Sequence, residues 1–223
     1  GDDVLEGGPG DDYANGGNGN DTYLWSPGDG NDLLDDPSGT DVLVMGGDIT
    51  AEDVRFTVSR DNLELHVGEE TIILNQQYRA DYKGLYNNQI ETVIFDNGEE
   101  IDLTKAPPLN GADQNDSLVG TSNDDVINGL AGDDRIDSRG GNDTINGGPG
   151  NDNMQAGDGN DVLEGGLGDD YANGGSGDDT YIWSPSDGND LLDDPSGDAD
   201  ILAIGGGITP NDVRFSVNGY GDN

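Results

Sequence analysis

A nine-residue period runs without a gap from Gly111 to Ile182. The units read GADQNDSLV, GTSNDDVIN, GLAGDDRID, SRGGNDTIN, GGPGNDNMQ, AGDGNDVLE, GGLGDDYAN and GGSGDDTYI. Position six is Asp in all eight units, and position eight is Leu, Ile, Met, Ala or Tyr. A short fixed period of this kind predicts a solenoid, because one unit cannot bury its apolar residue without its neighbours.

The same pattern opens the chain as GDDVLE, GGPGDDYAN and GGNGNDTYL, then PGDGNDLLD and DPSGTDVLV after a two-residue insertion, Trp25-Ser26. The insertion recurs as Trp183-Ser184, and residues 1–39 match 159–197 at an offset of 158. From about Asp41 onward the offset is 159. The chain therefore contains about one and a half copies of a large module, and we expect it to be a fragment of a parent that carries the module in tandem. We also expect the insertions to break the stacking of the units.

The sequence predicts four parts. They are the end of a first repeat block at 1–45, a strand-rich capping or insert segment at 46–105, a second repeat block at 106–204, and the truncated start of a second strand-rich segment at 205–223. Inside 46–105, apolar patterns predict short strands at Val54–Val58, Leu63–Val67, Thr71–Leu74, Ile90–Phe95 and Ile101–Leu103.

Two turns are predicted between these strands, at Asp61-Asn62 and at Asp96-Asn97-Gly98. The stretch Gln76–Leu85 is compatible with a short helix or with an irregular loop, and Pro107-Pro108 marks a linker before the second block.

The charge of the chain limits its partners. There are 48 Asp+Glu against 8 Lys+Arg, a formal net charge of −40, and only 30% of the residues are hydrophobic. Such a chain normally stays disordered unless cations pair its carboxylates. The negative field argues against nucleic acid and against anionic membrane surfaces. No stretch approaches the ~18 apolar residues of a membrane span, so membrane insertion is not expected.

Each unit is expected to form a six-residue loop followed by a short strand. Glycines permit backbone φ > 0 and leave carbonyl oxygens accessible, while the position-six Asp adds a carboxylate. Calcium prefers six to eight such oxygens at about 2.3–2.6 Å. One inward apolar residue per unit contributes about 1.5–3 kcal/mol, whereas ordering the backbone costs about 1–2 kcal/mol per residue. We therefore expect the chain to be unfolded without metal and to fold cooperatively with it.

The unit resembles the repeats of the RTX (repeats-in-toxin, haemolysin-type calcium-binding) family. The best matches are Gly7–Asp12, Gly16–Asp21, Gly147–Asp152, Gly165–Asp170 and Gly174–Asp179. The resemblance implies an all-β fold, a parallel β-roll in which calcium lies between every second loop. It also implies several calcium ions, about six or more, export by a type I secretion system, and a location that is secreted, extracellular or at the cell surface.

On the family pattern the position-six aspartates supply side-chain oxygens to the metal. They are Asp3, Asp12, Asp21, Asp32, Asp41, Asp125, Asp134, Asp143, Asp152, Asp161, Asp170, Asp179 and Asp190. The loop glycines supply carbonyl oxygens, and they are Gly8, Gly10, Gly17, Gly19, Gly132, Gly141, Gly148, Gly150, Gly157, Gly159, Gly166, Gly168, Gly175 and Gly177. Gln114 and Asn123 replace Gly at position four, so the first two units of the second block are expected to cap the roll without binding fully.

Two functions remain open from the sequence. The first is a non-catalytic calcium-binding module that folds outside the cell and serves secretion and structure. The alternative is a polysaccharide- or surface-binding module of an adhesin or a carbohydrate-active enzyme, with Trp25 and Trp183 as sugar contacts rather than as residues that close the roll. No zinc-ligand helix, serine elbow or triad is recognisable, and the single His66 is expected to be a packed or surface strand residue. Catalysis is therefore expected only outside this segment, in the parent protein.

Overall fold

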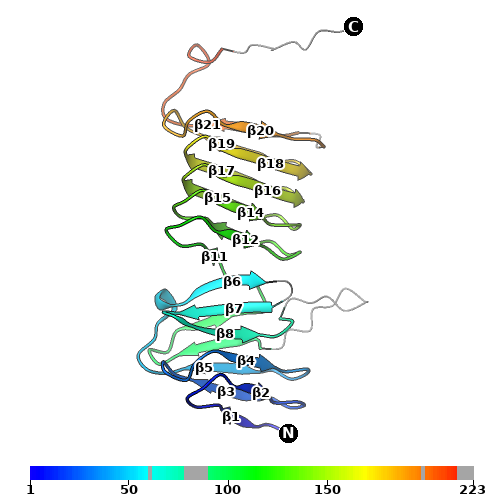
Figure 1. Ribbon diagram of the computed structural model, residues 1–223. Helices are drawn as coiled ribbons and strands as arrows, with labels where there is room; N and C mark the ends of the chain where they lie inside the picture. The colour runs from blue at the N-terminus through cyan, green and yellow to red at the C-terminus, as the bar shows by residue number, and fades with distance from the viewer. Residues whose placement is uncertain (60–61, 78–89, 197–198, 215–223) are drawn as a thin grey trace.

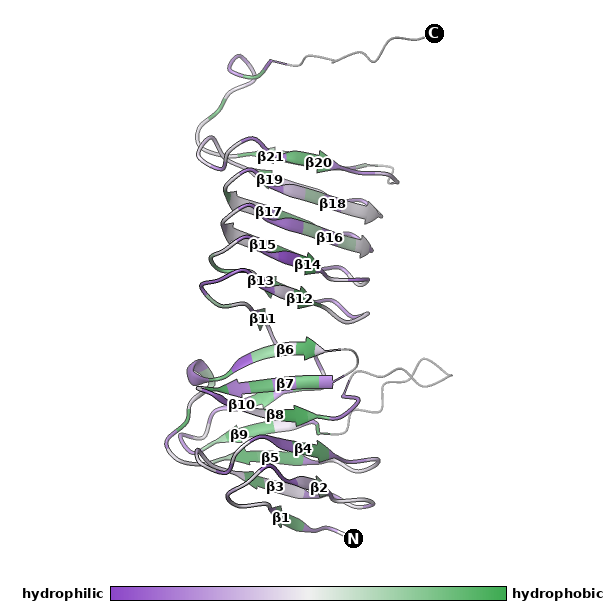
Figure 2. Cartoon of the chain, viewed as in Figure 1, coloured by the Kyte–Doolittle hydropathy of each residue, from purple (hydrophilic) through white to green (hydrophobic). Residues whose placement is uncertain are grey.

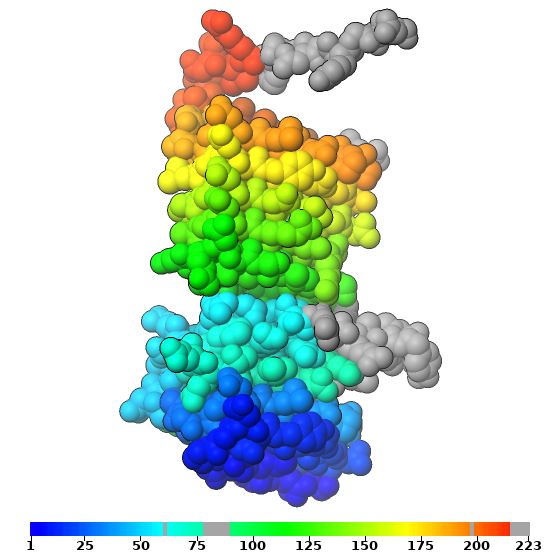
Figure 3. Space-filling view, viewed as in Figure 1, coloured from blue at the N-terminus to red at the C-terminus, as the bar shows by residue number. Residues whose placement is uncertain are grey.

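The computed structural model of the 223-residue chain describes residues 1–59, 62–77, 90–196 and 199–214. These residues form β-strands and one short 3₁₀ turn, Ala51–Asp53, and they contain no α-helix. No helix in this part of the chain is long and apolar enough to span a membrane. Figure 3 shows an elongated stack whose colours run in sequence order from the N-terminal to the C-terminal end. The all-β prediction is confirmed.

The second repeat block forms a roll with two parallel sheets. One sheet contains β12 (Ser117–Val119), β14 (Arg135–Asp137), β16 (Asn153–Asp158), β18 (Tyr171–Ser176) and β20 (Leu191–Asp193). The facing strands are β13 (Val126–Asn128), β15 (Thr144–Pro149), β17 (Val162–Leu167), β19 (Thr180–Trp183) and β21 (Ile201–Ile204). Ile127 pairs with Ile145 and Ile136 with Met154, so two nonapeptides make one turn of a parallel β-roll, as predicted.

The strands are longer in the middle of the roll than the repeat predicts. Each of β15 to β18 spans six residues and continues into the first three positions of the following unit. The inward residue at position eight is buried throughout, as expected. These buried residues are Leu118, Ile127, Ile136, Ile145, Met154, Leu163, Ala172 and Tyr181.

The first repeat block is built in the same way. One sheet contains β1 (Val4–Glu6), β3 (Thr22–Trp25) and β5 (Val42–Met45), and the other begins with β2 (Tyr13–Asn15) and β4 (Asp32–Asp35). Contrary to expectation, the Trp-Ser insertion does not break the stacking. Leu33 pairs in parallel with Tyr13, so the turn simply lengthens to 20 residues. The additional residues close as a small turn in which the Ser26 N–H donates to Asp29 Oδ2 at 2.8 Å.

The strand-rich segment joins the two rolls. Its strands β6 (Arg55–Ser59), β7 (Asn62–Val67) and β8 (Glu70–Leu74) form an antiparallel meander. β8 pairs in parallel with β4, and β6 pairs in parallel with β11 (Leu109–Asn110), which in turn pairs with β13. The result is one sheet of 11 strands in the order β2-β4-β8-β7-β6-β11-β13-β15-β17-β19-β21, which runs through both blocks (Figure 1).

The other face of the segment is a hairpin of β9 (Thr92–Phe95) and β10 (Glu100–Asp102), and β9 stacks in parallel on β5. The predicted turn is present: the Gly98 N–H donates to the Phe95 carbonyl at 2.8 Å, with Gly98 at φ +84°. The five predicted strands are therefore all formed, with bounds that differ by one or two residues. Asp61 and residues 78–85 of the two other predictions lie outside the described residues.

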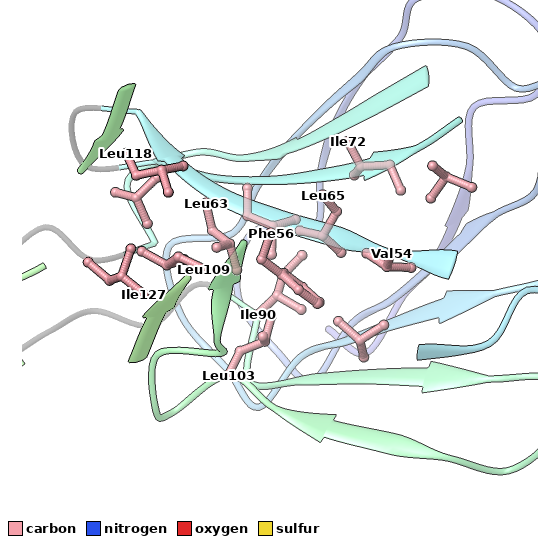
Figure 4. Packing of buried hydrophobic residues seen from close by; sticks show 14 of the residues in the cluster. Val54, Phe56, Leu63, Leu65, Ile72, Ile90, Leu103, Leu109, Leu118 and Ile127 are labelled. Carbon is pink, nitrogen blue, oxygen red and sulfur yellow. The ribbon is translucent and has the colours of Figure 1, made fainter. Parts of the chain in front are cut away.

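The segment has a thicker apolar core than either roll. Leu63, Leu65, Ile90 and Leu103 are all fully buried, and Figure 4 shows them gathered around Phe56. Figure 2 shows the corresponding strands as predominantly hydrophobic, whereas the strands of the second roll include long hydrophilic stretches. The rolls therefore depend more than the segment on interactions between polar groups.

Candidate metal centre

The loop glycines take up conformations that L-residues resist. Every loop glycine predicted from the repeat has a positive φ, between +75° at Gly8 and +154° at Gly150. The first glycine of a unit has a different role. A β-carbon on Gly147 would lie 2.4 Å from Asp152 Oδ2, so this position is glycine because the carboxylate occupies the space.

The position-six aspartates form a ladder along each side of the roll. The backbone N–H of Asp152 donates to Oδ1 of Asp170 at 2.8 Å, one turn further along the chain. On the opposite side the N–H of Asp161 donates to Oδ1 of Asp179, also at 2.8 Å. The structure thus brings together both pairs that the family pattern implies.

The same bond recurs in both blocks. In the second block it joins Asp116 to Asp134, Asp125 to Asp143, Asp134 to Asp152, Asp143 to Asp161, Asp170 to Asp190 and Asp179 to Asp200. In the first block it joins Asp3 to Asp21, Asp12 to Asp32 and Asp21 to Asp41. The ladder therefore continues across both Trp-Ser insertions, and Asp32 and Asp190 are in register.

Eight ladder aspartates have a second carboxylate oxygen that is buried without a hydrogen-bond donor. These oxygens are Oδ2 of Asp21, Asp41, Asp134, Asp143, Asp152, Asp161, Asp170 and Asp179. Burial, together with the charges of neighbouring carboxylates, raises the pKa of Asp152, Asp161 and Asp170 to about 6. A buried anionic oxygen without a donor is costly unless a cation approaches it. This donor set of carboxylate oxygens fits calcium.

Other predicted ligands have different surroundings. Asp3 is exposed, and Asp12 and Asp190 are half-buried. Asp125 is buried, but its Oδ2 accepts the Thr121 N–H at 2.6 Å, so a protein donor already satisfies it. Thr121 belongs to one of the two units that lack the position-four glycine, which agrees with the expectation that these units bind metal less fully.

Three members of the ladder are absent from the predicted ligands: Asp116, which occupies position six of the first unit of the second block, Asp200 and Glu91. The Asp41 N–H donates to Glu91 Oε2 at 2.5 Å, so a glutamate from outside the repeats takes the place of the next aspartate. Glu91 directly precedes β9, as Asp41 directly precedes β5, and this position was the available signal. Asp200 could have been found from the 159-residue offset to Asp41.

A second ladder runs along the exposed edge of the loops. At position five, the Asn151 N–H donates to Asp133 Oδ1 at 2.8 Å, and the Asp169 N–H donates to Asn151 Oδ1 at 2.9 Å. Here the acceptor lies one turn earlier, the reverse of the position-six ladder. Asn and Asp are equivalent in this role because each offers Oδ1, which explains why all eight regular units carry one or the other.

The aromatic residues of the repeats lie mainly inside the roll. Trp25 is 3% exposed, so no face of its ring is available to a sugar, and Trp183 is half-buried. The Tyr23 and Tyr181 hydroxyls both face the interior and accept the N–H of the first glycine of their own unit. His66 is a packed strand residue whose two ring nitrogens contact the hydroxyls of Thr57 and Thr71, at 2.7 and 3.1 Å.

The fold and the ladders define a parallel β-roll of the calcium-binding kind. A family model described as the RTX calcium-binding nonapeptide repeat matches residues 1–23, 110–145 and 146–181, with four copies. The chain therefore carries RTX calcium-binding nonapeptide repeats, and the sequence-based recognition is confirmed.

Other comparisons give no further likeness that bears on function. No curated protein matches the chain. Among solved structures, the extracellular lipase LipA from Serratia marcescens is similar, with 15% identity and a TM-score of 0.26. That alignment covers 92% of this chain and 38% of the lipase chain, so this chain spans well under half of the lipase.

Proposed function

We propose that the chain is a calcium-dependent folding module of a larger extracellular protein, with a structural rather than a catalytic role. The observation that carries the proposal is the row of buried Oδ2 oxygens without donors on each side of the roll. They recur once per turn, on residues such as Asp134, Asp152 and Asp170. With 8 Lys+Arg against 48 Asp+Glu, the chain cannot neutralise them with its own cations.

Calcium would supply the missing charge at these oxygens. The position-six carboxylates would hold it together with carbonyl oxygens of the loop glycines, with each ion shared by loops one turn apart. The number of ions, about six or more, is part of this proposal. Because each site exists only when two turns are stacked, binding energy becomes folding energy. Each site adds about 2.7 kcal/mol when calcium is at a hundred times its dissociation constant.

The consequence is a folding switch that depends on location. Where calcium is scarce, the carboxylates repel one another and the chain stays unfolded, in a form able to pass through a narrow type I export channel. Outside the cell, where calcium is plentiful, the rolls form. The four-part organisation at 1–45, 46–105, 106–204 and 205–223 belongs to the same proposal, in which the strand-rich segment closes one roll and begins the next.

Circular dichroism of the full chain, in excess chelator and then in calcium, tests the proposal. We expect β-structure to appear cooperatively with calcium and not with the same concentration of magnesium, which demands a stricter geometry. The paired variants Asp152→Asn and Asp158→Asn separate specific sites from general charge, since Asp158 is exposed and lies outside the ladder. Only Asp152→Asn is expected to raise the calcium midpoint. Full β-structure and unchanged thermal stability in chelator would refute the proposal.

The sugar-binding alternative has less support. It rested on Trp25 and Trp183 as a stacking platform, and Trp25 is enclosed in the core beside Met45, which is also buried.

A further inference from the structure

In each module, the last turn of the roll before the strand-rich segment contains a cluster of three carboxylates that the nonapeptide pattern does not predict. In the first module it comprises Asp21, Asp36 and Asp41, and in the second Asp179, Asp194 and Asp200. In each cluster one oxygen per residue lies within 4.8 Å of the others. Asp36 and Asp194 occupy position one of their units, where the repeat normally has glycine.

The third carboxylate points into the space that the first glycine keeps open. A β-carbon on Gly16 would lie 2.3 Å from Asp21 Oδ2 and 2.6 Å from Asp36 Oδ2, so both oxygens converge above the same α-carbon. Asp36 is fully buried there. A regular ladder step brings two position-six carboxylates together, whereas this step brings three.

A tyrosine fixes the third carboxylate in place. The Tyr23 hydroxyl accepts the Gly16 N–H at 2.7 Å and donates to Asp36 Oδ2 at 2.8 Å. The second module repeats the arrangement, where the Tyr181 hydroxyl donates to Asp194 Oδ2 at 3.0 Å. Tyr stands at position eight, where the other units have an aliphatic residue, so the tyrosine and the third aspartate occur together in both copies.

The cluster also contains buried oxygens that no protein group satisfies. Asp21 and Asp41 are 1% and 0% exposed, and Oδ2 of each has no donor. In the second module, Asp179 Oδ2 and Asp194 Oδ1 are likewise buried atoms without a hydrogen-bond donor. Oxygens bound to one calcium ion at about 2.4 Å lie at most about 4.8 Å apart, and the clustered atoms meet that limit.

We infer that the roll of each module ends in a calcium site of higher affinity than the ordinary ladder steps. Asp36 or Asp194 is the additional ligand, and Tyr23 or Tyr181 is its positioning residue. The inference rests on the proposed function, because it assumes that the ladder binds calcium. Three charged ligands in a preorganised site attract a divalent cation more strongly than two. The first cluster is fully buried, whereas in the second Asp194 is half-buried and Asp200 exposed, so the stronger site is expected in the first module. The first calcium ions to bind would then close the ends of the rolls, next to the strand-rich segment in the first module.

Terbium, which replaces calcium and luminesces when a nearby aromatic ring is excited, is a suitable probe for the full chain. A terbium ion at the cluster would lie beside Tyr23 or Tyr181. We expect the earliest part of the titration to give the sensitised signal, and the double variant Asp36→Asn/Asp194→Asn to lose it. Calorimetry with calcium should show the tightest class of sites weakened by at least about tenfold in that variant.

The matched control is Asp35→Asn/Asp193→Asn, which removes the same charge from the neighbouring position. Asp35 and Asp193 accept hydrogen bonds from the Tyr13 and Tyr171 hydroxyls at the surface. Both aspartates lie outside the clusters. The control should keep the tightest class of sites. A further readout separates ligation from packing: a lost ligand should weaken the tightest class of sites, whereas a packing defect should lower thermal stability in saturating calcium and leave that class intact.

The outcomes distinguish the two proposals. If wild type folds with calcium but the cluster variant keeps the tightest sites and the early terbium signal, the inference is wrong and the proposed function stands. Lower thermal stability of the cluster variant in saturating calcium, with the tightest class of sites kept, would also overturn it, in favour of a packing role. If wild type neither binds calcium nor folds with it, the proposed function itself fails.

Discussion

The two copies of the module have nearly the same sequence but different neighbours. In the second copy the opening strands β17 and β18 stack on β15 and β16, whereas the equivalent β1 and β2 have no turn beneath them in this chain. At the closing end the situation is reversed. β4 and β5 are covered by β8 and β9, whereas β20 and β21 are the last strands of their sheets.

This difference changes the burial of equivalent residues. Leu43 is 0% exposed under β9, while the equivalent Leu202 is 49% exposed. Leu34 and Leu192 differ in the same way, at 6% and 36%. The burial of a repeat unit therefore depends on whether another turn covers it, and not on its own sequence alone. The two copies provide each end of the module in a covered and an uncovered form, and the predictions below use that pairing.

The largest effect is expected where a β-carbon would enter the stack. Gly10 and Gly168 are equivalent and have φ of +142° and +149°. A β-carbon on Gly168 would lie 1.6 Å from the Gly150 carbonyl oxygen, whereas on Gly10 its nearest neighbour would be Asp12 Oδ2 at 3.9 Å. Gly168→Ala should destabilise the calcium-bound protein by more than about 4 kcal/mol, and Gly10→Ala by about 1–2 kcal/mol from its backbone conformation alone. Urea denaturation in saturating calcium measures both, and equal losses would contradict the stacking.

The closing end should show a smaller difference. Leu43→Ala opens a cavity in a closed core and should cost about 2–5 kcal/mol. Leu202→Ala, at the uncovered end, should cost less than about 1 kcal/mol, because its side chain is half in solvent in the folded state. The same denaturation experiment tests this pair. A cost at Leu202 that matched the cost at Leu43 would mean that β21 is covered in solution.

In the middle of the second roll, protonation of the buried carboxylates should partly replace the stabilising effect of calcium. Burial raises the pKa of Asp152, Asp161 and Asp170 to about 6, while unfolded carboxyls titrate near 3.9. Between about pH 6 and pH 4 the folded state binds more protons than the unfolded state, so stability without calcium should rise as pH falls through this range and be lost as pH rises through 6.

Circular dichroism in chelator at pH 5 and pH 7.5 measures this effect, with more β-structure expected at pH 5. Calcium affinity should move in the opposite direction, because protons and calcium compete for the same oxygens. A β-structure signal in chelator that stayed constant or fell on acidification would contradict the assignment of raised pKa values.

The smallest effect is expected at a departure from the repeat. Leu130 stands at position two, where the unit one turn later has Gly148, and it adopts φ +75°. Leu130→Gly should stabilise the calcium-bound protein by about 1 kcal/mol, because it relieves the left-handed conformation. The gain is reduced by the greater freedom of glycine in the unfolded chain. A loss of stability would mean that contacts of the exposed leucine outweigh its backbone strain.

The sequence predicted the parts of this structure that the repeat encodes locally. The apolar residue at position eight predicted the buried residues, and the resemblance to the RTX repeats supplied the two sheets of the roll and the pairs Asp152–Asp170 and Asp161–Asp179. These predictions succeeded because each depends only on a turn stacking on an identical turn.

The rest depends on contacts that the period does not contain. Glu91 enters the ladder 50 residues after Asp41, and its place directly before β9 is the only signal that marks it, because no nonapeptide surrounds it. The Trp-Ser insertion changes the spacing to 20 residues, yet hydrogen bonding across the turn keeps the register. The position-five ladder was missed for another reason. Position five varies between Asn and Asp, which resembles ordinary surface variation, and only the structure shows that both residues accept the same hydrogen bond through Oδ1.

The meander β6-β7-β8 has a consequence for association between molecules. A parallel roll that simply stopped would present a row of unpaired N–H and C=O groups, and such an edge recruits strands from other chains. Here β8 pairs with the last strand of one sheet of the first roll, and β6 pairs with β11 at the start of the next roll, so this side of the junction offers no open edge. On the other side, β10 and β12 are the end strands of their five-stranded sheets. In a series of such modules, the continuous sheet would expose an edge only at the ends of the whole array, whereas the other side would expose edges at every junction.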